Sequence, residues 1–164
     1  MKGGFVMDKL LVRSAQFEEN GWIPDCCASY GEDKSPELII EGIPEGTAAL
    51  AVVLDDLGHP IHPGFNHWTA WNISPSGIIP ANLPKGAILD EPIHIEQGIA
   101  WGKHCYRGPK PPFNWNHTYR FTVFALSKTI ELSPDSGKTE LLAAIEGLVL
   151  AKGELFGKYQ RKHR

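Results

Sequence analysis

Titratable side chains gather at three places where apolar, strand-like runs begin or end: Asp55-Asp56, His67, and His117 with Tyr119. Alternate residues of a strand share a face, so His117 and Tyr119 are expected to point the same way. If Asp56 and His67 lie beside that pair, one carboxylate, two imidazoles and one phenol line a small cavity. A carboxylate that accepts from an imidazole fixes its tautomer and favours its charged form, which can bind an anion. Either histidine taken alone is more often a partly buried structural residue, and periodicity does not show that the two meet.

Other chemistries use the same residues. His59, His62 and His67 lie near one another and could ligate zinc or iron, although no closely spaced His-x-His pair followed by a carboxylate is present. The Gly-x-Ser-x-Gly motif of a serine hydrolase is absent. A hydrolase or phosphate-transfer enzyme remains an alternative, with His67 and His117 as acid and base and Asp56 orienting one of them.

The elements that must position these side chains are mostly strands. Apolar or β-branched runs predict strands at residues 10–17, 38–40, 47–54, 67–73, 92–97 and 119–126, separated by long loops rich in Pro and Gly. Near the end, Leu141, Ile145, Leu148, Leu155 and Tyr159 fall on one helical face, which predicts a helix at about 139–151 and a short second helix. Strands first and helices last favour a β-sandwich or barrel whose loops carry the function.

Composition limits the class of protein. The 164 residues suit one domain with its own core, and the net charge of −3 without a broad basic patch argues against nucleic acid as the main partner. The apolar run Ala48–Leu54 is far shorter than a membrane helix, so we expect a cytoplasmic protein without stable membrane insertion. Cys26, Cys27 and Cys105 are odd in number, which favours reduced thiols. We expect folding to need no cofactor, metal or disulfide.

Several motifs, in this order, are similar to one family. They are Ser35-Pro36-Glu37-Leu38, Asp55 to Pro60, His67-Trp68, Tyr106 to Pro112, His117 to Phe121 with Ala125-Leu126, and Leu150 to Leu155 with Tyr159. Together they resemble the phosphatidylethanolamine-binding proteins, specifically the bacterial and archaeal branch called Raf kinase inhibitor-like proteins. The resemblance runs from about Leu11 to Tyr159.

The resemblance implies a mainly β fold of two packed antiparallel sheets with short C-terminal helices. A single domain would occupy residues 9–160, between a flexible segment at 1–8 and a basic tail at 161–164. It also implies a small anion pocket made by Asp56, His67, Lys110, Pro111, Pro112, His117 and Tyr119. The expected ligand is a phosphate-like group on a phosphorylated small molecule, a phospholipid head group or a phosphoprotein, and the role would be binding, with possible regulation of a kinase or phosphoprotein partner. A scaffold with a vestigial pocket is a further alternative.

Oligomeric state is a separate hypothesis. The prokaryotic branch is expected to form homodimers, and the aromatic segments at Trp101 and Phe113–Trp115 could supply an interface. The alternative, that these loops fold onto their own domain, stays open.

The sequence departs from the family pattern at three places. Leu57-Gly58-His59 follows Asp56 where the family commonly has Pro-Asp-Ala, so the rim lacks a second carboxylate and is expected to be less acidic. Thr118 stands between the histidine and tyrosine where the family often has Arg, and Gly147-Leu148 replaces a frequent Gly-His.

Overall fold

The fold is a sandwich of two β-sheets with a short α-helix on its outside. The structure, a computed structural model, describes residues 8–59 and 64–161. Apart from Asp8 and Arg161, the predicted flexible segment and basic tail lie outside these residues. Asp8 itself pairs with Ala151 in the large sheet.

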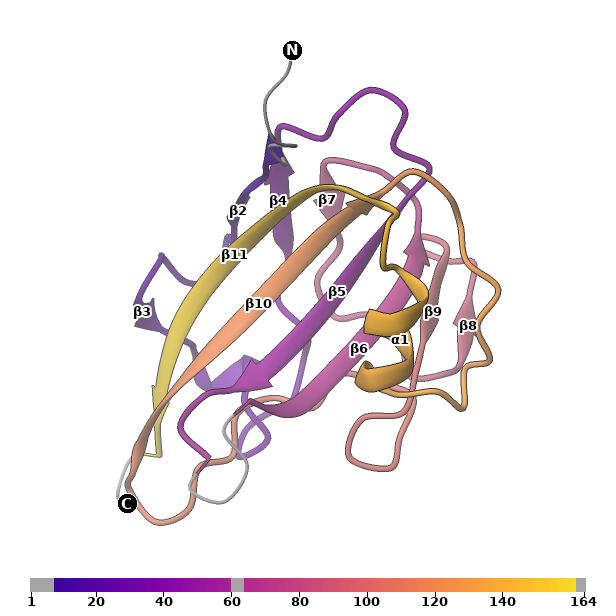
Figure 1. The fold of residues 1–164 in the computed structure, drawn as a ribbon. Coiled ribbons are helices and arrows are strands. Elements are labelled where there is room, and N and C mark those ends of the chain that lie inside the picture. The colour runs from indigo at the N-terminus through magenta and orange to yellow at the C-terminus, as the bar shows by residue number, and fades with distance from the viewer. Residues whose placement is uncertain (1–7, 60–63, 162–164) are drawn as a thin grey trace.

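The large sheet contains eight strands in the order β1-β11-β10-β5-β6-β9-β8, and β3 pairs with a further stretch of β11 (Figure 1). Its long members are β5 (Ala49–Asp56), β6 (Phe65–Ile73), β10 (Asn116–Leu126) and β11 (Val149–Gln160). The short ones are β1 (Asp8–Lys9), β3 (Gly21–Trp22), β8 (Ile88–Leu89) and β9 (Ile95–Gln97). Neighbours are antiparallel except that β1 and β3 run parallel to β11.

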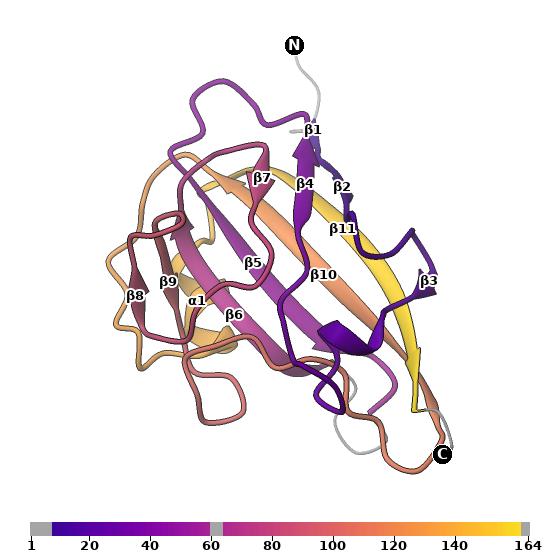
Figure 2. The same ribbon diagram turned by 180° about the vertical axis from the view of Figure 1, so that it is seen from behind.

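The small sheet packs against one face of the large sheet. It consists of β2 (Leu11–Arg13), β4 (Leu38–Glu41) and β7 (Ile78–Ile79), in that antiparallel order (Figure 2). The main core fills the space between the sheets, where Leu38, Leu54, Trp68 and Phe121 are almost wholly buried. Every residue of β5 is buried, as its continuous apolar run predicts for a strand covered on both faces.

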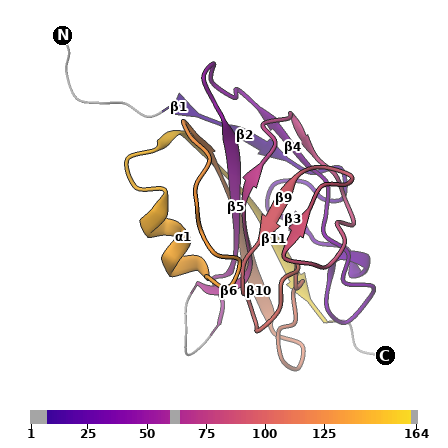
Figure 3. The same cartoon turned by 90° about the vertical axis from the view of Figure 1, so that its right-hand side faces the viewer.

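A third layer covers the opposite face of the large sheet. The helix α1 (Lys138–Ala144) and its C-cap residue place Leu141 and Ile145 against Trp71 and Leu126 in a second apolar cluster. Figure 3 shows α1 on one side of the large sheet and β4 of the small sheet on the other. Within the described ranges, 8–59 and 64–161, no helix has the length and apolar character needed to cross a membrane.

The predicted C-terminal helices are partly wrong. A helix is present, but it ends at Ala144, and residues 149–160 form strand β11 instead of the end of the first helix and a second one. Leu155 and Tyr159 are four residues apart, so their spacing fits a helix, yet an even spacing also places both on one face of a strand. Gly147, with a positive φ of 81°, separates the helix from the strand, in a conformation that glycine adopts easily. Burial then alternates along β11, with Gly153 and Gly157 on its inner face.

The predicted strands are present with different lengths. Those at 38–40, 47–54, 67–73 and 119–126 correspond to β4, β5, β6 and β10. The run 92–97 contributes only Ile95–Gln97, and the run 10–17 only the three residues of β2, because its chain leaves the sheet after Arg13.

Candidate functional site

The polar residues that the sequence singled out meet at one end of the large sheet. Asp56 ends β5, while His67 lies near the start of β6 and His117 near the start of β10. Because β5 is antiparallel to both neighbours, its last residues lie beside their first ones, at the lower end of the sheet in Figure 1. Tyr119 is the direct cross-strand partner of Asp56.

His117 is held by a carboxylate. Its Nδ1–H donates to Oδ2 of Asp56 at 2.8 Å, and both side chains are only 4% exposed. The other carboxylate oxygen, Oδ1, accepts the Gly58 backbone N–H at 2.8 Å. Gly58 also packs against the ring itself, since a Cβ built there would lie 2.8 Å from Cγ of His117. Asp56 therefore orients His117, and the absence of a side chain at Gly58 leaves room for the ring.

His67 is held by backbone carbonyls instead. Its Nδ1–H donates to the oxygens of Arg107 and Gly108 at 2.9 and 3.1 Å. Burial lowers the pKa of His67 below its ordinary 6.5, while these two hydrogen bonds and the charge of Asp56 oppose the shift. The imidazole is therefore mostly neutral near pH 7, with its proton on Nδ1.

The phenol of Tyr119 lies against both imidazoles. Its ring centroid is 5.5 Å from that of His67 and 6.4 Å from that of His117. The hydroxyl is buried and makes no hydrogen bond of ordinary geometry within the described residues. Burial, followed by the charge of Asp56, raises the pKa of Tyr119, while the backbone of Lys110 opposes the rise. The hydroxyl therefore keeps its proton and can donate a hydrogen bond.

Lys110, Pro111 and Pro112 lie in one loop but differ in their burial and their contacts. The Lys110 backbone lies next to the Tyr119 hydroxyl, and its side chain is exposed. Pro111 is buried, and its carbonyl accepts from the Tyr30 hydroxyl at 2.7 Å. Pro112 is exposed, and its carbonyl accepts the Trp115 N–H at 3.1 Å. The Lys110 backbone thus lies beside the phenol of the histidine–tyrosine cluster.

Aromatic side chains around the histidines were not predicted as part of the site. The Trp101 ring lies 4.8 Å from the His67 ring, and the Arg107 guanidinium lies 4.8 Å from the centre of the Trp101 ring. On the other side, Trp115 lies 6.4 Å from His117 and contacts Phe113. Trp101, Phe113 and Trp115 are 39%, 72% and 46% exposed. The sequence suggested them as a dimer interface or as loops folded onto their own domain, and not as neighbours of the histidines.

The metal alternative receives no support from the described ranges. His59 stacks on Phe65 with ring centroids 5.0 Å apart, and His62 lies outside the described residues. Across residues 8–59 and 64–161, no three His, Cys, Asp or Glu side chains gather as metal ligands.

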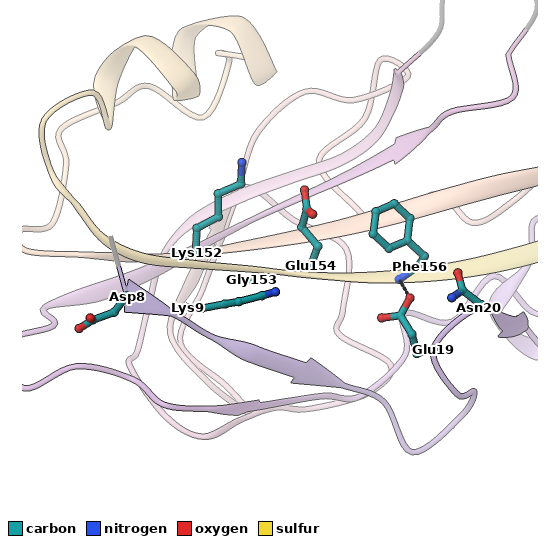
Figure 4. A pocket seen from close by; sticks show the side chains of 8 residues that line it. All are labelled: Asp8, Lys9, Glu19, Asn20, Lys152, Gly153, Glu154 and Phe156. Atoms are coloured by element: carbon teal, nitrogen blue, oxygen red, sulfur yellow. Dashed lines mark hydrogen bonds between the residues drawn. The ribbon is translucent and has the colours of Figure 1, made fainter. Parts of the chain in front are cut away.

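A pocket of about 660 Å³ lies elsewhere, along the outer edge of β11. Figure 4 shows Lys9, Glu19, Lys152 and Phe156 around it, with the Phe156 N–H donating to Glu19. It contains none of the predicted site residues, and its cations and carboxylates are mixed. The charge pattern does not indicate a particular ligand.

Comparisons with known proteins agree on one family. A family model described as phosphatidylethanolamine-binding protein matches residues 13–160. A UPF0098 protein of Pyrococcus horikoshii is 42% identical over 91% of this chain and 76% of its own length, and one of Pyrococcus abyssi is 40% identical over 98% and 89%.

Solved structures give the same result for the fold. A putative phosphatidylethanolamine-binding protein homologue of Chlamydia trachomatis has a TM-score of 0.83 at 25% identity, covering 94% of this chain and 99% of that one. E. coli YbcL, described as a member of the mammalian PEBP family, has a TM-score of 0.81 with the same identity and coverage. The chain therefore belongs to the phosphatidylethanolamine-binding protein family.

Proposed function

We propose that the site of Asp56, His67, His117 and Tyr119 binds a small oxyanion, namely phosphate or the phosphoryl group of a larger molecule. The observation that carries this proposal is the shared tautomer of the two histidines. Each Nδ1–H donates to an acceptor of the protein, a carboxylate for His117 and two carbonyls for His67. With Nδ1 of each ring engaged by the protein, Nε2 is the ring nitrogen that each histidine would offer to a ligand.

An oxyanion matches these groups. A protonated Nε2 is a charge-assisted donor, and the Tyr119 hydroxyl adds a neutral one that makes no hydrogen bond of ordinary geometry among the described residues. Because burial lowers the pKa of His67, its Nε2 carries no proton in most molecules near pH 7. Binding of a fully ionised anion then requires Nε2 to take up a proton from the solvent, whereas a ligand with an O–H can donate to Nε2 directly.

The surroundings favour an anion attached to a larger group. The exposed Lys110 and the half-buried Arg107 add positive charge near the two histidines, and Trp101 and Trp115 offer apolar surface beside them. The ligand would be a phosphorylated small molecule, a phospholipid head group or a phosphoprotein, in a cytoplasmic setting. Membership of the family supports a binding role.

Calorimetric titration with sulfate tests the proposal, because sulfate stays doubly charged and reports only the protein's protonation. We expect binding to strengthen as the pH falls from about 8 to about 6, since Nε2 of His67 must be protonated to donate. His67→Ala or His117→Ala should each remove a charge-assisted hydrogen bond worth about 1.5–3 kcal/mol, a loss of at least about tenfold in affinity.

His94→Ala is the matched control, because this histidine is exposed and pairs with Asp90 and Glu96 instead. It should bind sulfate as the parent does. Equal affinity in the parent and both site variants would refute the proposal. Soluble phosphoethanolamine, a phosphoserine peptide and inorganic phosphate, titrated in parallel, then rank the sources of the phosphoryl group.

A further inference from the structure

Two thiols outside the anion site lie side by side in the short 3₁₀ helix η1 (Asp25–Cys27). The Sγ atoms of Cys26 and Cys27 are 3.9 Å apart and share a thiol hydrogen bond. Cys26 is half-buried, while Cys27 is buried, so Cys26 is the more exposed of the two. A disulfide needs a sulfur separation of about 2.05 Å, so a movement of about 2 Å would close this pair.

The backbone of this pair is packed against the loop that holds His67. The Cys27 carbonyl accepts from the Tyr106 hydroxyl at 2.6 Å. The same carbonyl lies so near Gly108 that a Cβ on Gly108 would be 2.0 Å from it. The Gly108 carbonyl in turn accepts from His67 and, at 2.9 Å, from the Ser29 hydroxyl. Gly108 therefore contacts both the Cys27 peptide group and His67.

We infer that Cys26 and Cys27 form a site of reversible oxidation by hydrogen peroxide or an organic peroxide, and that closure of the pair displaces Gly108 and weakens anion binding. The first part stands independently, and the second rests on the function proposed above.

The chemistry balances with peroxide as the oxidant. The Cys26 thiolate attacks one peroxide oxygen, the O–O bond breaks, and Cys26 becomes a sulfenic acid while hydroxide leaves and takes up a proton as water. Cys27 then attacks the Cys26 sulfur, so the S–O bond breaks, the S–S bond forms, and a second water carries away the Cys27 proton. The two thiols lose two electrons and two protons. Burial raises the pKa of Cys27 to about 12, so the accessible Cys26 is the residue that reacts first.

The product would be easily reduced. Neighbouring Cα atoms are about 3.8 Å apart across a trans peptide, whereas disulfides usually join Cα atoms about 4.4–6.8 Å apart. A bridge between adjacent residues is therefore strained, and strained disulfides are the more oxidising, labile ones. This suits a reversible modification better than a structural crosslink.

Peptide mapping tests the oxidation. Trypsin places Cys26 and Cys27 together in peptide 14–34 and Cys105 in peptide 104–107. After peroxide treatment, peptide 14–34 should lose about 2 Da, resist alkylation at both cysteines, and recover both properties with dithiothreitol. Cys105→Ser should respond as the parent does, and Cys26→Ser should not. Oxygen adducts without the 2 Da loss, or continued alkylation of both thiols, would overturn the inference.

The coupling is measured on the same samples. The imidazole NMR resonance of His67, assigned with His67→Gln, should shift on oxidation in the absence of any anion. Loss of one hydrogen bond at His67 should weaken sulfate binding about fivefold. An unchanged His67 resonance in fully oxidised protein overturns the coupling. A reduced protein that does not bind sulfate instead overturns the proposed function, and the resonance still decides the coupling.

Discussion

At the scale of single residues, the site depends on one position that has no side chain. Gly58 follows Asp56 by two residues, donates its N–H to that carboxylate, and lies against the flat face of His117. A Cβ would lie 2.8 and 2.9 Å from Cγ and Cδ2 of the ring, closer than carbon atoms approach without movement. The sequence showed Gly58 as a departure from the family pattern, and the structure gives it a role in packing.

Gly58→Ala is expected to displace His117 and weaken sulfate binding by at least about tenfold, as His117→Ala would, because the ring can no longer keep its bond to Asp56. Overpacking should cost about 1–3 kcal/mol of stability. Calorimetry and urea denaturation measure the two effects. In the control Gly77→Ala, the new Cβ would be 3.5 Å from the nearest atom, an ordinary contact, so binding should be retained. An unaltered sulfate affinity in Gly58→Ala would contradict this role.

Residue types and strand periodicity predicted much of the site but not all of it. Alternation predicts only that His117 and Tyr119 share a face, and their meeting with Asp56 was a hypothesis. In the structure Asp56 accepts from His117 and lies opposite Tyr119. The partners of His67 are the carbonyls of Arg107 and Gly108, and a backbone carbonyl is the same in every residue. No sequence pattern could mark them as ligands of the imidazole.

At the scale of elements, β11 shows why the end of the chain was misread. Leu155 and Tyr159 satisfy the helical period and the strand period at once. Tertiary contacts decide between the two: β11 pairs with β10 along its length and with the short strands β1 and β3 on its other side. These partners lie far away in the sequence, so local patterning could not reveal them, whereas β5 and β10 were recognisable from their own composition.

The close packing of a glycine on the inner face of β11 leads to a prediction about stability. Gly153 lies so close to the backbone of Leu10 that a Cβ at position 153 would be 2.3 Å from the Leu10 carbonyl oxygen. Gly153→Ala should therefore push β11 away from the backbone of residue 10 and lower the free energy of unfolding by about 1–3 kcal/mol or more. Urea denaturation measures it. Lys152→Ala, at the exposed neighbouring position, should change stability by only about 0.5 kcal/mol. If both variants have similar free energies of unfolding, β11 accommodates the added Cβ without loss of stability, and the prediction is wrong.

At the scale of the whole molecule, stability should depend on pH through His67. The pKa of His67 in the folded protein lies below its ordinary value of 6.5 in the unfolded chain. At a pH between these two pKa values, the unfolded chain therefore binds more protons than the folded protein. Stability is therefore lost as the pH falls from about 6.5 through the folded pKa. His94 acts in the opposite sense, because its hydrogen bond to Asp90 raises its pKa, but it is exposed and its effect is small.

Comparing the parent with His67→Gln isolates the effect. The parent should lose more thermal stability than the variant between about pH 7.5 and pH 5.5, because glutamine does not titrate. Differential scanning calorimetry measures both melting temperatures. If the melting temperatures of parent and variant fall in parallel with pH, then protonation of His67 does not destabilise the folded protein, and the prediction is wrong. Added sulfate should reduce the difference, since it binds the protonated form.

The order of the strands in the large sheet has a consequence for biosynthesis. β1 pairs with Ala151 and Lys152 of β11, and β11 is the strand that pairs with one edge of β10. The ribosome makes β11 last among the described strands, so β5, β6 and β10 emerge with the hydrogen-bonding groups of one β10 edge still unpaired. Exposed strand edges of this kind promote aggregation, and pairings between distant segments form slowly. The large sheet is therefore expected to close late in translation or after it, and a nascent chain stalled before residue 149 should be a better substrate for chaperones than the full-length chain.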